Sequence, residues 1–76
     1  MNNIRRKKLH KLQEQLEEIL DCLDELKSEE ETYLYNIPDN LQGSERYERA
    51  ENSVSNLEDA CTSLEDVISS IEEAVI

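Results

Sequence analysis

The sequence predicts an all-α fold, an antiparallel hairpin of two coiled-coil-like helices. Between Val54 and Val75, apolar residues recur at alternating steps of three and four, which is the spacing of a helix that packs against another helix. The same spacing begins at Leu9 and continues through the first third of the chain. The only proline and the only glycine, Pro38 and Gly43, lie between these two stretches and indicate a turn. We therefore expect one helical-hairpin domain over residues 1–76.

The first helix is expected over residues 3–35. Asn2 or Asn3 can cap its N-terminus, and neither proline nor glycine interrupts the stretch that follows. The heptad spacing predicts an inner stripe that faces the second helix. It consists of Leu9, Leu12, Leu16, Ile19, Leu23 and Leu26, continued by Glu30 and Tyr33.

The turn is expected over residues 36–43 and the second helix over residues 44–75. Pro38 disfavours helix at the residue before it. Ser44 is a good N-cap, and Glu45 and Glu48 place negative charge in the first turn, where the helix dipole favours it. The inner stripe of this helix consists of Val54, Leu57, Cys61, Leu64, Ile68, Ile71 and Val75.

A hairpin centred on Asn40 pairs inner residues whose numbers add to 80. This register places Leu23 opposite Leu57 and Ile19 opposite Cys61. It also predicts two ion pairs between the helices, Arg6 with Glu72 and Lys27 with Glu51. The basic N-terminus would then lie beside the acidic end of the second helix and neutralise it.

A strip of small, mostly apolar residues lies outside the predicted inner stripes. It consists of Cys22, Ala60, Val67 and Ala74. A single hairpin would leave these residues in water, and a chain of 76 residues seldom gains enough stability from one small core. We expect two hairpins to associate through this strip as a homodimeric four-helix bundle.

The charge balance excludes some partners. The chain has 19 acidic and 8 basic side chains, a net charge of -11, which disfavours direct binding to nucleic acid or to an anionic membrane. No apolar run suits a signal peptide or a transmembrane helix, and the two cysteines, Cys22 and Cys61, occupy helical positions typical of reduced thiols. The expected location is the cytoplasm.

Six acids of the second helix recur in pairs every seven residues and form what we call the acidic ridge. They are Glu58, Asp59, Glu65, Asp66, Glu72 and Glu73. At 1.5 Å of rise per residue the ridge carries one charge per about 5 Å, against one per about 3.4 Å along a DNA strand. Such a row could occupy the basic surface of a nucleic-acid-binding or defence protein. The alternative interpretation is a solvated face that keeps a small bundle soluble.

The segment from Ile37 to Arg46, with the Leu57-Glu58-Asp59-Ala60 repeat that follows, resembles small acidic helical-hairpin proteins of Gram-positive bacteria and their phages or mobile elements. No activity is assigned to that group. The resemblance implies a phage-type protein that acts by binding another molecule.

Residue patterns typical of catalysis or metal binding are scarce. His10 lies among lysines, and no Cys-x-x-Cys or Glu-x-x-His pattern occurs. Glu17, Glu18 and Asp21 match a motif of all-α, magnesium-dependent nucleotide pyrophosphatases, but the heptad spacing directs them outward. We therefore expect no catalytic residues, metal or cofactor. The predicted function is a non-enzymatic acidic binding protein, an inhibitor or DNA mimic; the alternatives are an oligomeric helical adaptor that acts through apolar contacts and, more remotely, a pyrophosphatase-like enzyme.

Overall fold

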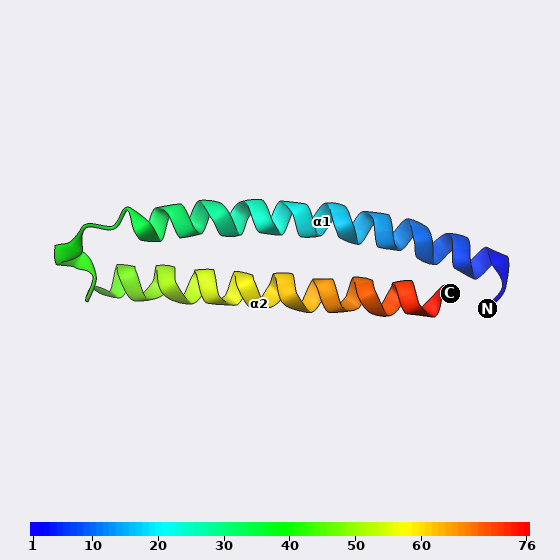
Figure 1. Cartoon of the computed structure of the whole chain (residues 1–76). Helices are drawn as coiled ribbons and strands as arrows, with labels where there is room; N and C mark the ends of the chain where they lie inside the picture. Colours follow the sequence, from blue (N-terminus) through cyan, green and yellow to red (C-terminus); the bar gives the residue numbers. More distant parts are fainter.

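The computed structural model describes all 76 residues and shows two long helices packed antiparallel (Figure 1). Helix α1 spans Asn3–Tyr35 and helix α2 spans Glu45–Ala74. The turn between them contains a short 3-10 helix, η1, at Asp39–Leu41. The turn lies at one end of the hairpin and both chain termini lie toward the other. The predicted all-α hairpin is confirmed.

Side-chain caps fix where both helices begin. The Asn2 side chain accepts a hydrogen bond from the Arg5 backbone N–H at 2.8 Å, and the Ser44 hydroxyl accepts one from the Tyr47 N–H at 3.2 Å. Each cap satisfies one of the backbone donors that a helix N-terminus leaves without an intrahelical partner. Ser44 therefore acts as the predicted N-cap of α2.

The turn closes the end of the hairpin. Ile37 is one of only four buried residues of the chain, and its backbone N–H bonds to the Leu34 carbonyl at 3.2 Å. Beyond Pro38 the chain winds through η1, where the Leu41 N–H bonds to the Pro38 carbonyl at 2.8 Å. Gly43 does not adopt a positive φ, so the turn does not depend on the conformational freedom of glycine.

The inner stripe of α2 agrees with the prediction. Every residue predicted from Val54 to Val75 is buried or half-buried, and Cys61 and Ile68 are among the four buried residues. Ala50, one turn before Val54, is also buried and extends this stripe toward the hairpin turn.

The predicted inner stripe of α1 is half wrong. Leu9, Leu16, Leu23 and Glu30 are half-buried as expected, but Leu12, Ile19, Leu26 and Tyr33 are exposed. The remaining inner positions are taken by Gln13, Leu20, Lys27 and Leu34. The error has a geometric cause, because Leu9, Leu16 and Leu23 can be joined into one helical stripe either by residues three positions further on or by residues four positions further on.

The register between the helices also differs from the prediction. Gln13 donates a hydrogen bond to Glu72 at 3.1 Å, and the Asp24 carboxylate lies at the Cys61 thiol. These contacts and the alignment of the two inner stripes set the register. Inner residues of α1 and α2 that face each other have numbers that add to about 84, not to 80 as predicted. Leu20 then faces Leu64, and Leu16 faces Ile68.

The shifted register removes the ion pairs expected between the helices. Arg6 and Lys27 do not pair with Glu72 and Glu51, and the two ion pairs of the structure, Lys27 with Asp24 and Arg49 with Glu45, each lie within one helix. The start of α1 extends past the end of α2 (Figure 1). The basic N-terminus therefore projects beyond the end of α2 and forms no ion pair with it.

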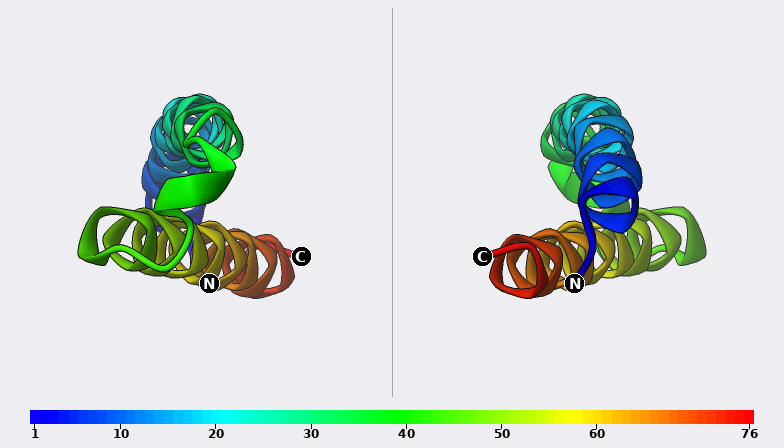
Figure 2. Two further views of the ribbon diagram at one scale, coloured as in Figure 1. Left: turned by 90° about the vertical axis from the view of Figure 1, so that its left-hand side faces the viewer. Right: turned by 90° about the vertical axis from the view of Figure 1, so that its right-hand side faces the viewer.

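The molecule is long and thin. Its principal extents are 59 × 15 × 13 Å, and the two helices cross at an angle when viewed along the hairpin (Figure 2). Neither helix contains an apolar stretch that could cross a membrane. The single line of contact between α1 and α2 divides the remaining surface into two sides, which differ in chemistry.

Candidate functional site

One side of the hairpin collects acidic side chains from both helices. On α2, three acids of the ridge each lie four positions after an inner residue. We call Glu58, Glu65 and Glu72 the inner row of the acidic ridge. On α1 the equivalent positions are held by Glu17, Asp24 and Glu31. In an antiparallel pair these two flanks border the same side of the contact line. The acidic ridge together with these three α1 residues is named the acidic face.

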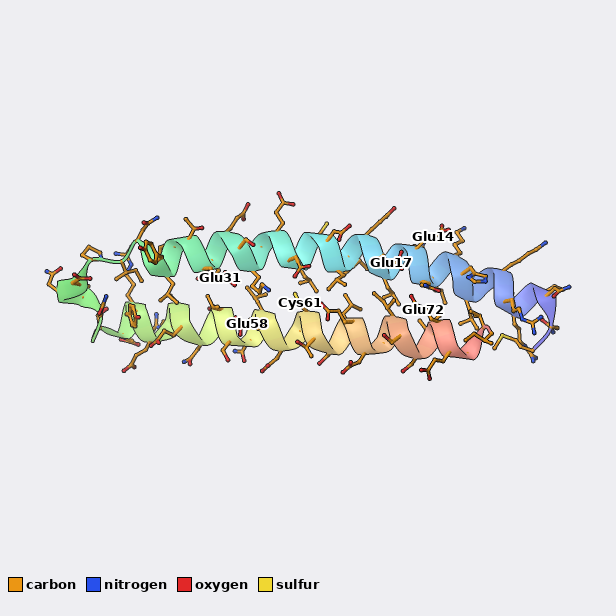
Figure 3. All side chains as sticks on the ribbon, viewed as in Figure 1. Glu14, Glu17, Glu31, Glu58, Cys61 and Glu72 are labelled. Carbon is orange, nitrogen blue, oxygen red and sulfur yellow. The ribbon has the colours of Figure 1, made fainter.

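Contacts at two levels of the hairpin support this placement. The hydrogen bond from Gln13 to Glu72 ties the inner row to α1 near the termini. Near the middle, Asp24 of α1 and Glu65 of α2 both act on the thiol of Cys61. Figure 3 shows Glu17 and Glu31 on α1 and Glu58 and Glu72 on α2 beside the line between the helices.

The pKa of the buried Cys61 thiol is affected by the negative charges on this side. Burial raises the pKa of Cys61 above its ordinary value of 9.0, and a hydrogen bond to Asp24 and the negative charges of Asp24 and Glu65 raise the pKa further, while the charge of Lys27 lowers it. The thiol is therefore protonated at neutral pH. In that state it can donate a hydrogen bond to the Asp24 carboxylate.

The acidic ridge is exposed and unpaired. All six of its residues are exposed, and neither of the two ion pairs of the structure includes one of them. The outer row, formed by Asp59, Asp66 and Glu73, follows the inner row by one position along α2 and forms no ion pair with α1. The ridge is as accessible as the sequence predicted, and the structure adds Glu17, Asp24 and Glu31, which sequence reasoning missed. The signal was an acid at the same heptad position of each successive repeat in both helices.

The opposite side of the hairpin is apolar. The predicted interface residues Cys22, Ala60, Val67 and Ala74 are all exposed there. The four α1 residues that were wrongly predicted to face α2 are exposed on the same side. We call this surface the apolar face, defined by Leu12, Ile19, Leu26 and Tyr33 of α1 with Ala60, Val67 and Ala74 of α2.

One contact joins the two helices on the apolar side. The Arg46 guanidinium lies 5.2 Å from the centre of the Tyr33 ring and its Nε donates to the Tyr33 hydroxyl at 2.6 Å. Both residues flank the inner stripes on the side away from Glu65 and Glu72. This contact covers the turn end of the apolar face and leaves Leu12, Ile19 and Leu26 open.

The remaining candidate groups do not converge. Glu17, Glu18 and Asp21 are exposed, and His10 is exposed near the N-terminus. No group of three or more histidine, cysteine, aspartate or glutamate side chains is placed to hold a metal ion. In comparisons with known proteins, no family model matches the chain, and no curated protein or solved structure gives a significant match.

Proposed function

We propose that this chain is a non-enzymatic acidic binding protein whose acidic face binds a basic surface on another protein. The observation that carries the proposal is the exposed, unpaired acidic ridge with a second row of acids from α1 beside it. The partner class that we propose is a nucleic-acid-binding or defence protein, because the surface that binds DNA phosphates is basic. A phage-type inhibitor that mimics DNA would act in this way.

The geometry favours fast, charge-driven association. Successive residues of the inner row are seven positions apart, or about 10.5 Å along the helix. The α1 acids lie beside them, so the charge is spread over a surface instead of a single line. Because the six carboxylates of the acidic ridge have no ion-pair partner within the chain, binding at the ridge breaks no existing ion pair. Long-range attraction to a basic surface raises the association rate and weakens steeply with salt.

The distribution of acids on α2 argues against a face that serves solubility alone. A surface that serves solubility alone needs some charge, but it does not need that charge at particular outward positions. From Asn52 to the C-terminus, however, acids occupy only the two heptad positions that form the acidic ridge. The other three outward positions carry neutral residues, mostly serine and alanine. The charge is concentrated on one side, as a binding surface requires.

The test compares two variants with equal charge. The first neutralises part of the ridge through Glu58→Gln, Asp59→Asn, Glu65→Gln and Asp66→Asn. The control neutralises four acids on the outer surface of α1 through Glu14→Gln, Glu18→Gln, Asp21→Asn and Glu25→Gln. Both remove four negative charges, and all eight side chains are exposed. Circular dichroism is used to check that both variants remain helical.

The immobilised wild-type chain is used to isolate basic proteins from cells of its host, and each purified protein is titrated calorimetrically. We expect the ridge variant to bind at least about tenfold more weakly, or about 1.4 kcal/mol, while the control stays close to wild type. Equal weakening in both variants would show that only net charge matters. Unchanged affinity in the ridge variant would exclude the acidic ridge as the binding surface.

A second candidate function is a helical adaptor that captures a helix of another protein on the apolar face. The exposed Leu12, Ile19 and Leu26 favour it, because single hydrophobic side chains are common on surfaces but a repeating stripe is not. Binding of this kind would persist at a salt concentration of about 0.5 M, where ionic attraction is screened.

A further inference from the structure

The two candidate stripes of α1 differ in polarity, and the structure buries the more polar one. Gln13 and Lys27 face α2, whereas Ile19 and Leu26 are 51% and 53% exposed. A hairpin that functions alone would gain by turning the aliphatic stripe inward, since burial of each aliphatic side chain contributes about 1.5–3 kcal/mol. The outward stripe is explained if it has a partner of its own. We propose that this partner is a second copy of the chain, packed apolar face to apolar face in a four-helix bundle.

The exposed area of the hairpin agrees with a missing partner. The chain exposes 5808 Å² and buries only four of its 76 residues. A monomeric globular protein of 8.9 kDa exposes about 4,800 Å². The excess of about 1,000 Å² is close to the area of about 800 Å² that each partner buries in a stable protein interface.

The apolar face is suited to pack against itself. Along the apolar face, each bulky residue of α1 lies beside a smaller residue of α2. Inner residues pair where their numbers add to about 84, and flanking residues on this side pair where their numbers add to 86. The pairs are Leu12 with Ala74, Ile19 with Val67, Leu26 with Ala60 and Tyr33 with Ser53. The bulky and the small row have the same length. A two-fold axis along the hairpin would set the bulky row of one copy over the small row of the other. Each bulky side chain of α1 then packs against alanine, serine or valine of the other copy.

The pattern of charge favours a second copy over a basic partner at this face. From Ser53 to Ala74 the outward positions of α2 on this side carry no charge; they are Ser53, Asn56, Ala60, Ser63, Val67, Ser70 and Ala74. A basic partner would be attracted by acids at the rim, and the α2 rim carries none. A copy with a net charge of -11 would be repelled by such acids. In the proposed bundle both acidic faces point away from the interface, so this inference does not depend on the proposed function.

The experiment measures the mass of the intact chain by sedimentation equilibrium. At about 100 µM we expect twice 8.9 kDa, with a thermal midpoint that rises with protein concentration because folding and association are coupled. The double variant Ile19→Lys with Leu26→Lys is expected to sediment as a monomer. The matched control, Glu18→Lys with Glu25→Lys, places lysine at the preceding residue in each case, on the outer surface, and is expected to remain a dimer.

A second variant covers the case in which the lysine pair prevents folding. Ala60→Arg changes one exposed residue of α2 and should also abolish the dimer. Unfolding of both interface variants, while the control stays a folded dimer, would equally support an interface on which folding depends. Three results would overturn the proposal: a wild-type monomer at about 100 µM with a midpoint independent of concentration, a dimer that persists in both interface variants, or a control that dissociates as they do.

Discussion

Replacing Lys27 by leucine tests which stripe of α1 faces α2. Lys27 lies at an inner position opposite Leu57, with its side chain 26% exposed and its ammonium 3.7 Å from Asp24. A fully buried leucine contributes about 1.5–3 kcal/mol. The gain is reduced because the lysine methylenes already cover part of this surface and because a partly exposed ion pair worth about 0–1 kcal/mol is lost. We expect Lys27→Leu to stabilise the chain by about 1 kcal/mol.

The matched control is Lys11→Leu, which removes the same charge and adds the same side chain on the exposed outer surface of α1. We expect its effect to stay within about 0.5 kcal/mol. Thermal unfolding followed by circular dichroism at one fixed protein concentration measures both, since 1 kcal/mol moves the midpoint by about 4–8 °C in a domain of this size. If Lys27→Leu stabilises no more than Lys11→Leu, Lys27 does not face α2 and the observed register is refuted.

Three further predictions concern salt, the cysteines and the turn. The chain should melt at a higher temperature in about 0.3 M than in about 0.01 M NaCl, because like-charged residues four apart on α1 cost about 0.2–0.5 kcal/mol per pair and screening relieves them; a lower midpoint would show that attraction dominates. A thiol reagent should label exposed Cys22 before buried Cys61. The raised pKa of Cys61 keeps its thiol neutral in the folded chain, whereas the thiol of the unfolded chain ionises at its ordinary pKa of 9.0. The free energy of unfolding should therefore decrease as the pH rises above 9.0, and Cys61→Ala should make this decrease smaller. Finally, Gly43→Ala should stabilise the chain by about 0.4–1 kcal/mol in denaturant titrations, because an added Cβ meets no atom within 4 Å and φ is not positive, whereas a loss would indicate strain in the turn.

The ends of both helices could be predicted from the sequence because local chemistry determines them. Ser44 can bond only to backbone donors within reach of its own side chain, and Pro38 restricts only the residue before it. The inner stripe of α2 was predictable for a similar reason. Between Val54 and Val75 only one stripe consists mainly of leucine, isoleucine and valine, because the alternative on one side carries acids and the alternative on the other carries mostly serine and alanine.

The inner stripe of α1 could not be predicted in the same way, because two stripes compete for it. Both share Leu9, Leu16 and Leu23, and the choice between Ile19 and Leu20, or between Leu26 and Lys27, depends on the rotation of α1 about its axis. That rotation follows from contacts between the helices, including those of Gln13 with Glu72 and Asp24 with Cys61. A search that maximises buried hydrophobicity selects Leu26 over Lys27. The same error displaced the register and the predicted ion pairs.

The two surfaces of the hairpin impose opposite demands on one small chain. An acidic face strengthens attraction to a basic partner, yet the same charge opposes association with a second copy. The sequence of α2 satisfies both demands, because its acids lie at two neighbouring heptad positions and its alanine and serine residues lie on the side away from them. The inward position of Lys27 has the same effect, since its charge lies beside Asp24 instead of on the apolar face. The separation of charge on α2 is therefore the pattern expected if both proposed interfaces exist in one chain.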